Sequence, residues 1–192
     1  MRTTIKNIAT VQMGYSFRSR LETANDGNVT VIQMKDLPDN NTVNCDKLTR
    51  INMKTIKQHH LAIKGDLIFR SRGLTTTSAI LSENPGKAVI AAPLLRIRVT
   101  KPGKVLPEYL NWYINQRDAQ RYFTSRQEGT SVNMISQKQL KEMPVVVPHL
   151  EQQKNIVELA SLSAQEQNIL KALAEKRKQY ISAILMQLAK GE

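Results

Sequence analysis

The sequence predicts an α+β protein in two parts. Residues 1–148 form a mixed, mostly β domain with short helices, and residues 149–192 form one long α-helix. Short apolar, β-branched runs separated by turn residues fill the first part. The second part contains no proline, and no glycine before Gly191, and its apolar residues recur at helical spacing. With 41% hydrophobic residues, the 192-residue chain can form a core.

Three segments of the first part have strand-like patterns. "NVTVIQM", residues 28–34, clusters β-branched residues, and "GDLIFRS", residues 65–71, places a short apolar run after a turn. "AVIAAPLLRIRVT", residues 88–100, ends in apolar residues that alternate with arginines. This alternation predicts a strand whose two faces have different surroundings.

Helical patterns follow. "LPEYLNWYINQRDAQRYFTSR", residues 106–126, predicts a helix with Pro107 in its first turn. A short helix is expected in "ISQKQLKEM", residues 135–143, where Ser136 is a suitable N-cap. "PVVV", residues 144–147, predicts a last extended piece before the long helix.

The long helix carries one apolar stripe. Roughly 40 residues at 1.5 Å each give a rod about 60 Å long, too long to lie on a domain whose radius of gyration is about 15 Å. Glu166, Lys176 and Arg177 interrupt the stripe, which favours an intermolecular antiparallel coiled coil over a long parallel zipper. The alternative is a terminal helix packed partly on its own domain. The predicted dimerisation residues are Ile156, Leu159, Leu162, Ile169, Leu173, Tyr180, Ile184 and Leu188.

The positive charge is concentrated in the first part. The chain has 28 Lys and Arg against 16 Asp and Glu, a net charge of +12. Residues 149–192 contain six basic and five acidic residues, which leaves 22 minus 11, or +11, for residues 1–148. Such a domain attracts a polyanion, because each neutralised phosphate releases condensed counterions. A solubilising charged surface is the alternative explanation.

Other features favour a cytoplasmic protein. No run of 18 apolar residues predicts a transmembrane helix, and the first residues lack the apolar core of a signal peptide. The single cysteine, Cys45, excludes a disulfide framework within the chain.

No familiar catalytic motif is present. The "NPGK" and "PGK" stretches lack the first glycine of a phosphate-binding P-loop. The chain has no nucleophile elbow, no dinucleotide-binding fingerprint and no Cys/His pair of metal-binding spacing. It also lacks the Asn-Pro-Pro-Tyr type of stretch that amino-methyltransferases use. We expect a non-catalytic chain without a metal or cofactor of its own, and an enzyme with an unfamiliar site is the alternative.

Three polar loops combine arginines with hydroxyl and amide side chains: "GYSFRSR" (residues 14–20, the first loop), "FRSRGLTTTS" (69–78, the second) and "TSRQEGTSVN" (124–133, the third). Arginine can pair with guanine, and Gln or Asn with adenine, through two hydrogen bonds. Hydroxyl groups suit phosphates. The predicted DNA-binding residues are Arg18, Ser19, Arg20, Lys35, Arg70, Ser71, Arg72, Thr75, Thr76, Arg126, Gln127, Thr130, Ser131 and Asn133.

These segments, in this order, resemble the specificity subunit of type I restriction–modification systems, in a half-length form with one target-recognition domain and one helical region. The resemblance rests on "VQMGYSF", "KGDLIFRSRG", "GTSVNMISQKQL" and "VPHLEQQKNI". The last is similar to the family pattern Val-Pro-Pro-Leu-x-Glu-Gln-x-x-Ile. His149 replaces its second proline and Gln152 its glutamate, which affects only the start of the helix.

The resemblance implies a role in recognising double-stranded DNA without catalysis. A separate modification subunit would methylate adenine with S-adenosylmethionine, and a restriction subunit would be a third partner. Full-length members carry two recognition domains and two helical regions. Two copies of this chain, paired through the helix, would therefore read an inverted repeat whose spacer is set by the helix length. The alternatives are a regulatory or decoy fragment that pairs with full-length specificity subunits, and a non-specific basic DNA-binding protein.

Overall fold

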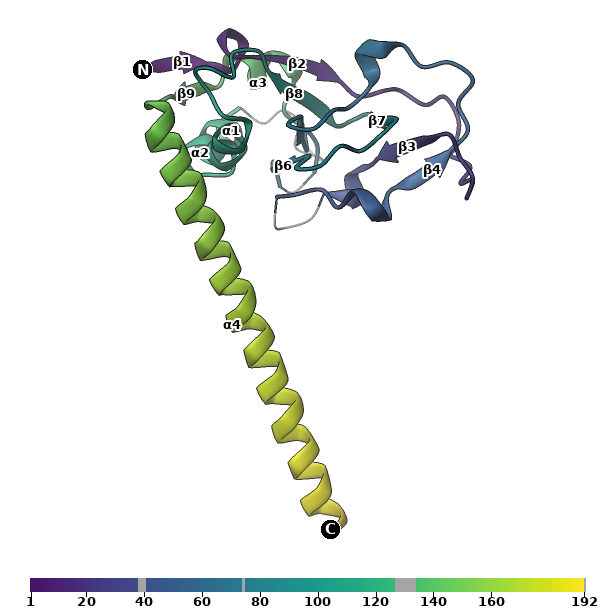
Figure 1. Ribbon diagram of the computed structural model, residues 1–192, viewed down its shortest axis with the longest axis vertical. Helices are drawn as coiled ribbons and strands as arrows, with labels where there is room; N and C mark the ends of the chain where they lie inside the picture. Colours follow the sequence, from purple (N-terminus) through teal and green to yellow (C-terminus); the bar gives the residue numbers. More distant parts are fainter. Residues whose placement is uncertain (38–40, 74, 127–133, 192) are drawn as a thin grey trace. The chain divides into compact units, whose positions relative to one another are not determined.

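The computed structural model describes residues 1–37, 41–73, 75–126 and 134–191 (Figure 1). The chain separates into two compact units, Met1–Lys154 (unit 1) and Asn155–Glu192 (unit 2). Unit 1 mixes short strands and short helices, and unit 2 is helical, so the predicted α+β class is confirmed. The first turn of the long helix, up to Lys154, belongs to unit 1.

The described part of unit 1 contains three small sheets. The largest is antiparallel and has the strand order β2 (Ala9–Met13), β8 (Leu95–Val99), β5 (Leu67–Phe69), β6 (Ser78–Ile80). The second has the order β4 (Thr49–Ile51), β3 (Val29–Ile32), β7 (Ala88–Ile90), with β3 antiparallel to β4 and parallel to β7. The third pairs β1 (Arg2–Thr4) with β9 (Pro144–Val146). The 3-10 turns are η1 (Ile5–Asn7), η2 (Met34–Asp36), η3 (Cys45–Lys47) and η4 (Gln58–His60).

The predicted strand over residues 88–100 is in fact two strands, β7 and β8. A turn at residues 91–94 separates them, and the two strands belong to different sheets. Two other predicted strands are confirmed as β3 and β5, and the predicted extended piece after residue 143 is confirmed as β9. The carbonyls of this turn accept hydrogen bonds from two of the polar loops.

The helices of unit 1 are α1 (Pro107–Ile114), α2 (Arg117–Thr124) and α3 (Gln137–Glu142). The prediction of one helix over residues 106–126 was wrong, because the chain becomes extended at Gln116 (φ −83°, ψ 159°). At this break the Asn115 amide donates a hydrogen bond to the Ser78 carbonyl on β6 (2.9 Å). Helix α3 begins as predicted, with a capping box in which the Ser136 hydroxyl accepts a hydrogen bond from the Gln139 backbone N–H (3.2 Å).

Unit 1 buries its apolar side chains in a continuous interior. One cluster lies between the large sheet and the β3–β7 pair and includes Ile32, Ile68, Leu81 and Leu94. On the large sheet, Phe69 contacts Phe123 of α2, with ring centroids 5.0 Å apart and both side chains fully buried. Burying one such large side chain contributes about 1.5–3 kcal/mol to the free energy of unfolding. Unit 1 therefore has a hydrophobic core of its own.

Two arginines of β8, Arg96 and Arg98, donate hydrogen bonds to groups inside unit 1. Asp66 is fully buried, and both its carboxylate oxygens accept hydrogen bonds from the Arg98 guanidinium (2.6 and 2.7 Å). The hydrogen bond to Asp66 raises the pKa of Arg98. Arg96 is buried and donates to the carbonyls of His59 and Leu61 (2.9 and 3.0 Å). Gly65, which directly precedes Asp66, has φ +85°, a backbone conformation that favours glycine. The Gly-Asp pair therefore forms a turn that places the Asp66 carboxylate inside unit 1.

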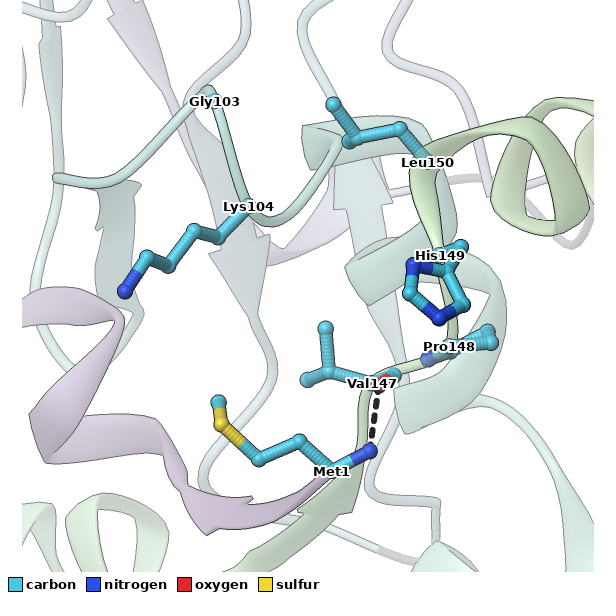
Figure 2. A pocket seen from close by; sticks show the side chains of 7 residues that line it. All are labelled: Met1, Gly103, Lys104, Val147, Pro148, His149 and Leu150. Atoms are coloured by element: carbon cyan, nitrogen blue, oxygen red, sulfur yellow. Dashed lines mark hydrogen bonds between the residues drawn. The ribbon is translucent and has the colours of Figure 1, made fainter.

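The last helix, α4 (Leu150–Lys190), begins in unit 1. The Gln153 side chain is fully buried there: it accepts a hydrogen bond from the Leu106 N–H (2.9 Å) and donates to the carbonyls of Lys104 and Pro148 (both 2.8 Å). Next to this anchor lies a hollow of about 610 Å³, where the Met1 amino group donates to the Val147 carbonyl (2.8 Å; Figure 2). The residues around the hollow hold β9 and the helix start together.

Along unit 2 the helix leaves its large apolar side chains uncovered. Leu159 is 70% exposed and Leu173 is 53% exposed. The predicted stripe residues Leu162, Ile169, Tyr180 and Leu188 are exposed as well, and Ile156 and Ile184 are half-buried. Four further large apolar residues that the sequence analysis did not include are also exposed: Leu170, Ile181, Leu185 and Met186.

Candidate nucleic-acid interface

The turn at residues 91–94 joins the first two polar loops. The Gly14 N–H at the start of the first loop donates to the Leu94 carbonyl (2.9 Å), and the Ser71 hydroxyl of the second loop donates to the Pro93 carbonyl (2.5 Å). A Cβ atom on Gly14 would lie 2.7 Å from the backbone of Ala91, so only glycine fits this close approach. The glycine of the first loop is thus a packing requirement.

The third loop is tied to the second. The Ile135 N–H donates to the Ser71 carbonyl (2.8 Å), and Arg72 and Met134 form an isolated antiparallel β-bridge. The ends of all three loops are therefore connected through hydrogen bonds around one turn. Segments far apart in the sequence are brought together in a single part of unit 1.

The first loop borders a groove. Arg18, Ser19 and Arg20 are exposed and line a hollow of about 570 Å³, which residues 51–53 at the end of β4 also line. Phe17 packs against the cluster around Val31 and anchors the loop from below. The two guanidinium groups beside the groove can bind phosphates of a DNA backbone, which positions the protein, or can bind base edges, which selects the sequence.

Lys35 lies near the other end of β4 from the groove and adds another positive charge beside this strand. It is exposed on η2, and its ammonium group donates a hydrogen bond to the Thr49 hydroxyl at the start of β4 (3.1 Å). Arg50, the next residue of β4, is exposed too and was not among the predicted contacts. A three-residue strand has too short a pattern for sequence analysis to have placed Arg50 here.

Three predicted residues of the second loop have contacts inside unit 1. Arg70 donates to the carbonyls of Met34 and Leu37 (3.1 and 3.2 Å), which holds the turn that displays Lys35. Ser71 is buried against Pro93, as described. Thr76 is buried and donates to the Gln120 side-chain oxygen (3.1 Å). These side chains have structural partners, so their predicted contact with DNA stays a prediction without support from the geometry.

Other predicted residues of these loops are available. Arg72 and Thr75 are exposed in the second loop. Arg126, at the start of the third loop, is exposed and lies 3.9 Å above the ring of Tyr122. Tyr122 donates its hydroxyl hydrogen to the Gln139 carbonyl (2.9 Å), so the ring is a fixed platform for the guanidinium. The remaining predicted residues of the third loop, Gln127, Thr130, Ser131 and Asn133, lie outside the described residues.

The Tyr122–Arg126 pair was missed by the sequence analysis. Its spacing of four residues was a usable signal, since such pairs meet on a helix surface. Burial raises the pKa of Tyr122, so this phenol stays neutral and adds no negative charge near the arginine. His60 is also neutral near pH 7, because burial and then the neighbouring His59 lower its pKa. The positive charge of this region comes from arginine and lysine.

Metal binding and thiol chemistry would depend on side chains among the described residues. Among them, no three His, Cys, Asp or Glu side chains are grouped so that they could hold a metal ion. Burial, then Glu83 and Asp46, raise the pKa of the Cys45 thiol, which disfavours the reactive thiolate form. In the searched part of the chain, no helix combines the length and apolar character needed to cross a membrane.

Comparison with known proteins gives one family. The family model described as the type I restriction modification DNA specificity domain matches residues 1–177. No protein with a curated description matches the chain.

Solved structures share the fold. A chain from a structural study of complex assembly and conformational transition in the type I R-M system is 17% identical, with a TM-score of 0.71. The type I restriction-modification S subunit from M. genitalium is 13% identical with a TM-score of 0.60, and the HsdS subunit from Thermoanaerobacter tengcongensis 18% identical with 0.63. Each alignment covers 93% of this chain but only 42%, 42% and 39% of the other chains, so this chain spans about two fifths of their length.

Proposed function

Because the chain belongs to the family of type I restriction–modification DNA specificity domains, we propose that it recognises a DNA sequence on behalf of a separate adenine methyltransferase subunit. The observation that carries the proposal is the connection of the three polar loops around residues 91–94 in a domain with a charge of +11. The loops present exposed arginines to a polyanion, as a DNA-reading surface requires.

The proposed contact residues are the exposed members of the predicted set: Arg18, Ser19, Arg20, Lys35, Arg72, Thr75 and Arg126. To these we add Arg50, which lies between Thr49 and the groove of the first loop. Gln127, Thr130, Ser131 and Asn133 stay in the proposal on sequence grounds alone. Arg70 supports the turn that displays Lys35, so we propose that it acts indirectly.

The chain itself is proposed to be non-catalytic. S-adenosylmethionine would bind only the modification subunit, and a restriction subunit would join the same assembly in the cytoplasm. The match to the DNA specificity domain family supports this view.

We propose that two copies associate through α4 and read an inverted repeat. The support is the row of exposed apolar side chains along unit 2, which a second helix would cover. A two-fold dimer reads a two-fold target, and the helices would fix the spacer between the half-sites.

The test is selection from a randomised duplex library, with the chain alone and with its modification subunit, at fixed moderate salt. Enrichment of an inverted repeat with one spacer length is the expected result. Enrichment of a single half-site would retain recognition and reject the homodimer. Binding without enrichment in either condition would leave a non-specific basic protein and overturn the proposal.

A variant pair makes the selection sharper. Replacing Arg72 and Arg126 by Gln should weaken or relax the selected half-site, because both guanidinium groups are exposed at the connected loops. The matched control, Lys178→Gln with Lys190→Gln, removes two positive charges from exposed positions of α4 and should leave the selected sequence unchanged. Equal effects of both changes would mean that only total charge matters.

A further inference from the structure

Seven large apolar residues of unit 2 follow an eleven-residue repeat, and the exposed Ile169, Tyr180, Leu185 and Met186 lie one or two residues from repeat positions. Starting at Leu159, the repeat positions advance by steps of 3, 4 and 4 residues through the helix. Nine positions result: Leu159, Leu162, Glu166, Leu170, Leu173, Arg177, Ile181, Ile184 and Leu188. An eleven-residue repeat has 3.67 residues per turn, close to the 3.6 of a straight helix, so these side chains stay on one face along its length.

The repeat includes Leu170 and Ile181, which flank the predicted stripe and are each 56% exposed. Seven of its nine positions carry Leu or Ile. The other two carry opposite charges, Glu166 and Arg177, and in the described part of the chain neither forms an ion pair. Both charged groups stand in the middle of an apolar face that has no cover within unit 2.

The repeat is symmetric about the point between Lys171 and Ala172. Counting outwards from that point, Leu170 corresponds to Leu173 and Glu166 to Arg177. Further out, Leu162 corresponds to Ile181 and Leu159 to Ile184. A helix whose pattern reads the same in both directions is suited to pair with a second copy running the opposite way.

We infer that two copies of the chain pair antiparallel about a two-fold axis between Lys171 and Ala172, with Glu166 of each copy facing Arg177 of the other. This inference rests on the proposed homodimer and adds its register. The other layers between Leu159 and Ile184 then join Leu to Leu or Leu to Ile, and Leu188 faces Asn155 at each end of the pair. The two charges that interrupt the apolar face neutralise each other twice, once on each side of the axis.

Charge disfavours the parallel arrangement. In a parallel, in-register pair, Glu166 would face Glu166 and Arg177 would face Arg177, and like charges opposite each other destabilise a pair of helices. The antiparallel register also determines the reach of the dimer. At 1.5 Å per residue, the two Lys154 residues lie about 50 Å apart along the paired helices.

Charge exchange tests the register in the full-length protein. Glu166→Arg alone places two arginine pairs in the interface, and we expect the dimer dissociation constant to rise on the order of tenfold. Arg177→Glu alone should weaken the dimer similarly, and the double exchange should restore it. Glu175→Arg, the same change at an exposed helix position outside the repeat, is the control and should have little effect.

Cysteine pairing tests the same register independently, in a Cys45→Ala background. Proteins carrying Leu162→Cys and Ile181→Cys, refolded together, should form a mixed disulfide dimer, whereas neither should cross-link with itself. Leu162→Cys with Leu188→Cys, about 10 Å out of register, is the control pair and should not cross-link.

The outcomes separate this inference from the proposed function. A wild-type chain that is monomeric by mass would reject the homodimer itself. A dimeric wild type that shows self-cross-linking of Leu162→Cys, or no rescue by the double exchange, would reject the register alone.

Discussion

Leu67 and Phe69 of unit 1 are completely buried, whereas Leu159 and Leu188 of unit 2 are 70% and 67% exposed. The charged residues differ in the same way. In unit 1, Asp66 binds Arg98 within the same chain, whereas the charges in the apolar row of unit 2, Glu166 and Arg177, have no ion-pair partner in the described residues. Unit 1 buries its core and pairs Asp66 within the chain, whereas the apolar row of unit 2 stays uncovered.

This difference separates two kinds of stability. Unit 1 should unfold at a free energy that does not depend on protein concentration. In the proposed dimer, the helix of unit 2 would gain most of its stability from covering its apolar row, since helical stability in proteins comes mainly from packing an apolar face. Its melting should therefore depend on concentration, as the stability of any associating structure does.

The largest expected effect comes from breaking the helix pair. Leu173→Glu puts a carboxylate next to the proposed two-fold axis, where it would face Leu170 of the second copy. We expect the mass measured by light scattering to fall to that of a monomer at micromolar concentration, with loss of helical signal. Gln179→Glu, outside the row, is the control, and an unchanged mass for Leu173→Glu would contradict the dimer.

The second largest effect should lie inside unit 1. Asp66→Asn leaves Arg98 without its charge partner in a mostly buried place, and breaking such a pair costs about 3 kcal/mol of unfolding free energy. Urea unfolding of the full chain measures it. The control is Asp118→Asn in the exposed pair with Arg121 (3.8 Å), where the loss should stay below about 0.5 kcal/mol. Similar losses of unfolding free energy at both sites would mean that burial does not make the Asp66–Arg98 ion pair more important for stability than the exposed Asp118–Arg121 pair.

The junction between the units gives an intermediate effect. Gln153→Met keeps the size of the side chain but leaves one N–H and two carbonyl groups without their partner. We expect a loss of about 2 kcal/mol in the unfolding free energy of unit 1. Gln152→Met, at the exposed neighbouring position, should be near neutral. If the two variants unfolded alike, Gln153 would not anchor the helix.

The sequence predicted the features that depend on local pattern. The long helix, the Ser136 cap and strands β3 and β5 have clear periods or cap residues, and they are present. The wrong single helix over residues 106–126 has a tertiary cause, because Asn115 turns to hydrogen-bond with Ser78 of β6. Strands of three residues, such as β4, are too short to show a period.

The interface was predictable only as a set of loops. Arg70 and Arg72 stand two residues apart in the same basic loop, and the sequence treats them alike. The structure directs Arg70 to carbonyls more than 30 residues earlier in the chain and leaves Arg72 exposed. Whether such a side chain is buried or exposed depends on contacts between distant segments, which one sequence does not reveal. The same limit applies to Gly14. Glycine is required there because the backbone of Ala91 lies too close for a Cβ atom, and this contact is visible only in the structure.

These two arginines provide the smallest and most selective comparison. Arg72→Gln should weaken DNA binding by on the order of 1 kcal/mol, because it removes one exposed cation, and should change the unfolding free energy by less than about 0.5 kcal/mol. Arg70→Gln should do the reverse and lower the unfolding free energy, since the turn at Met34–Asp36 loses two hydrogen bonds. Binding titrations at two salt concentrations, with urea unfolding of the same preparations, measure both quantities. If Arg70→Gln reduced affinity at full stability, its guanidinium would have to leave the carbonyls and contact DNA directly, and the division between supporting and reading arginines would be wrong.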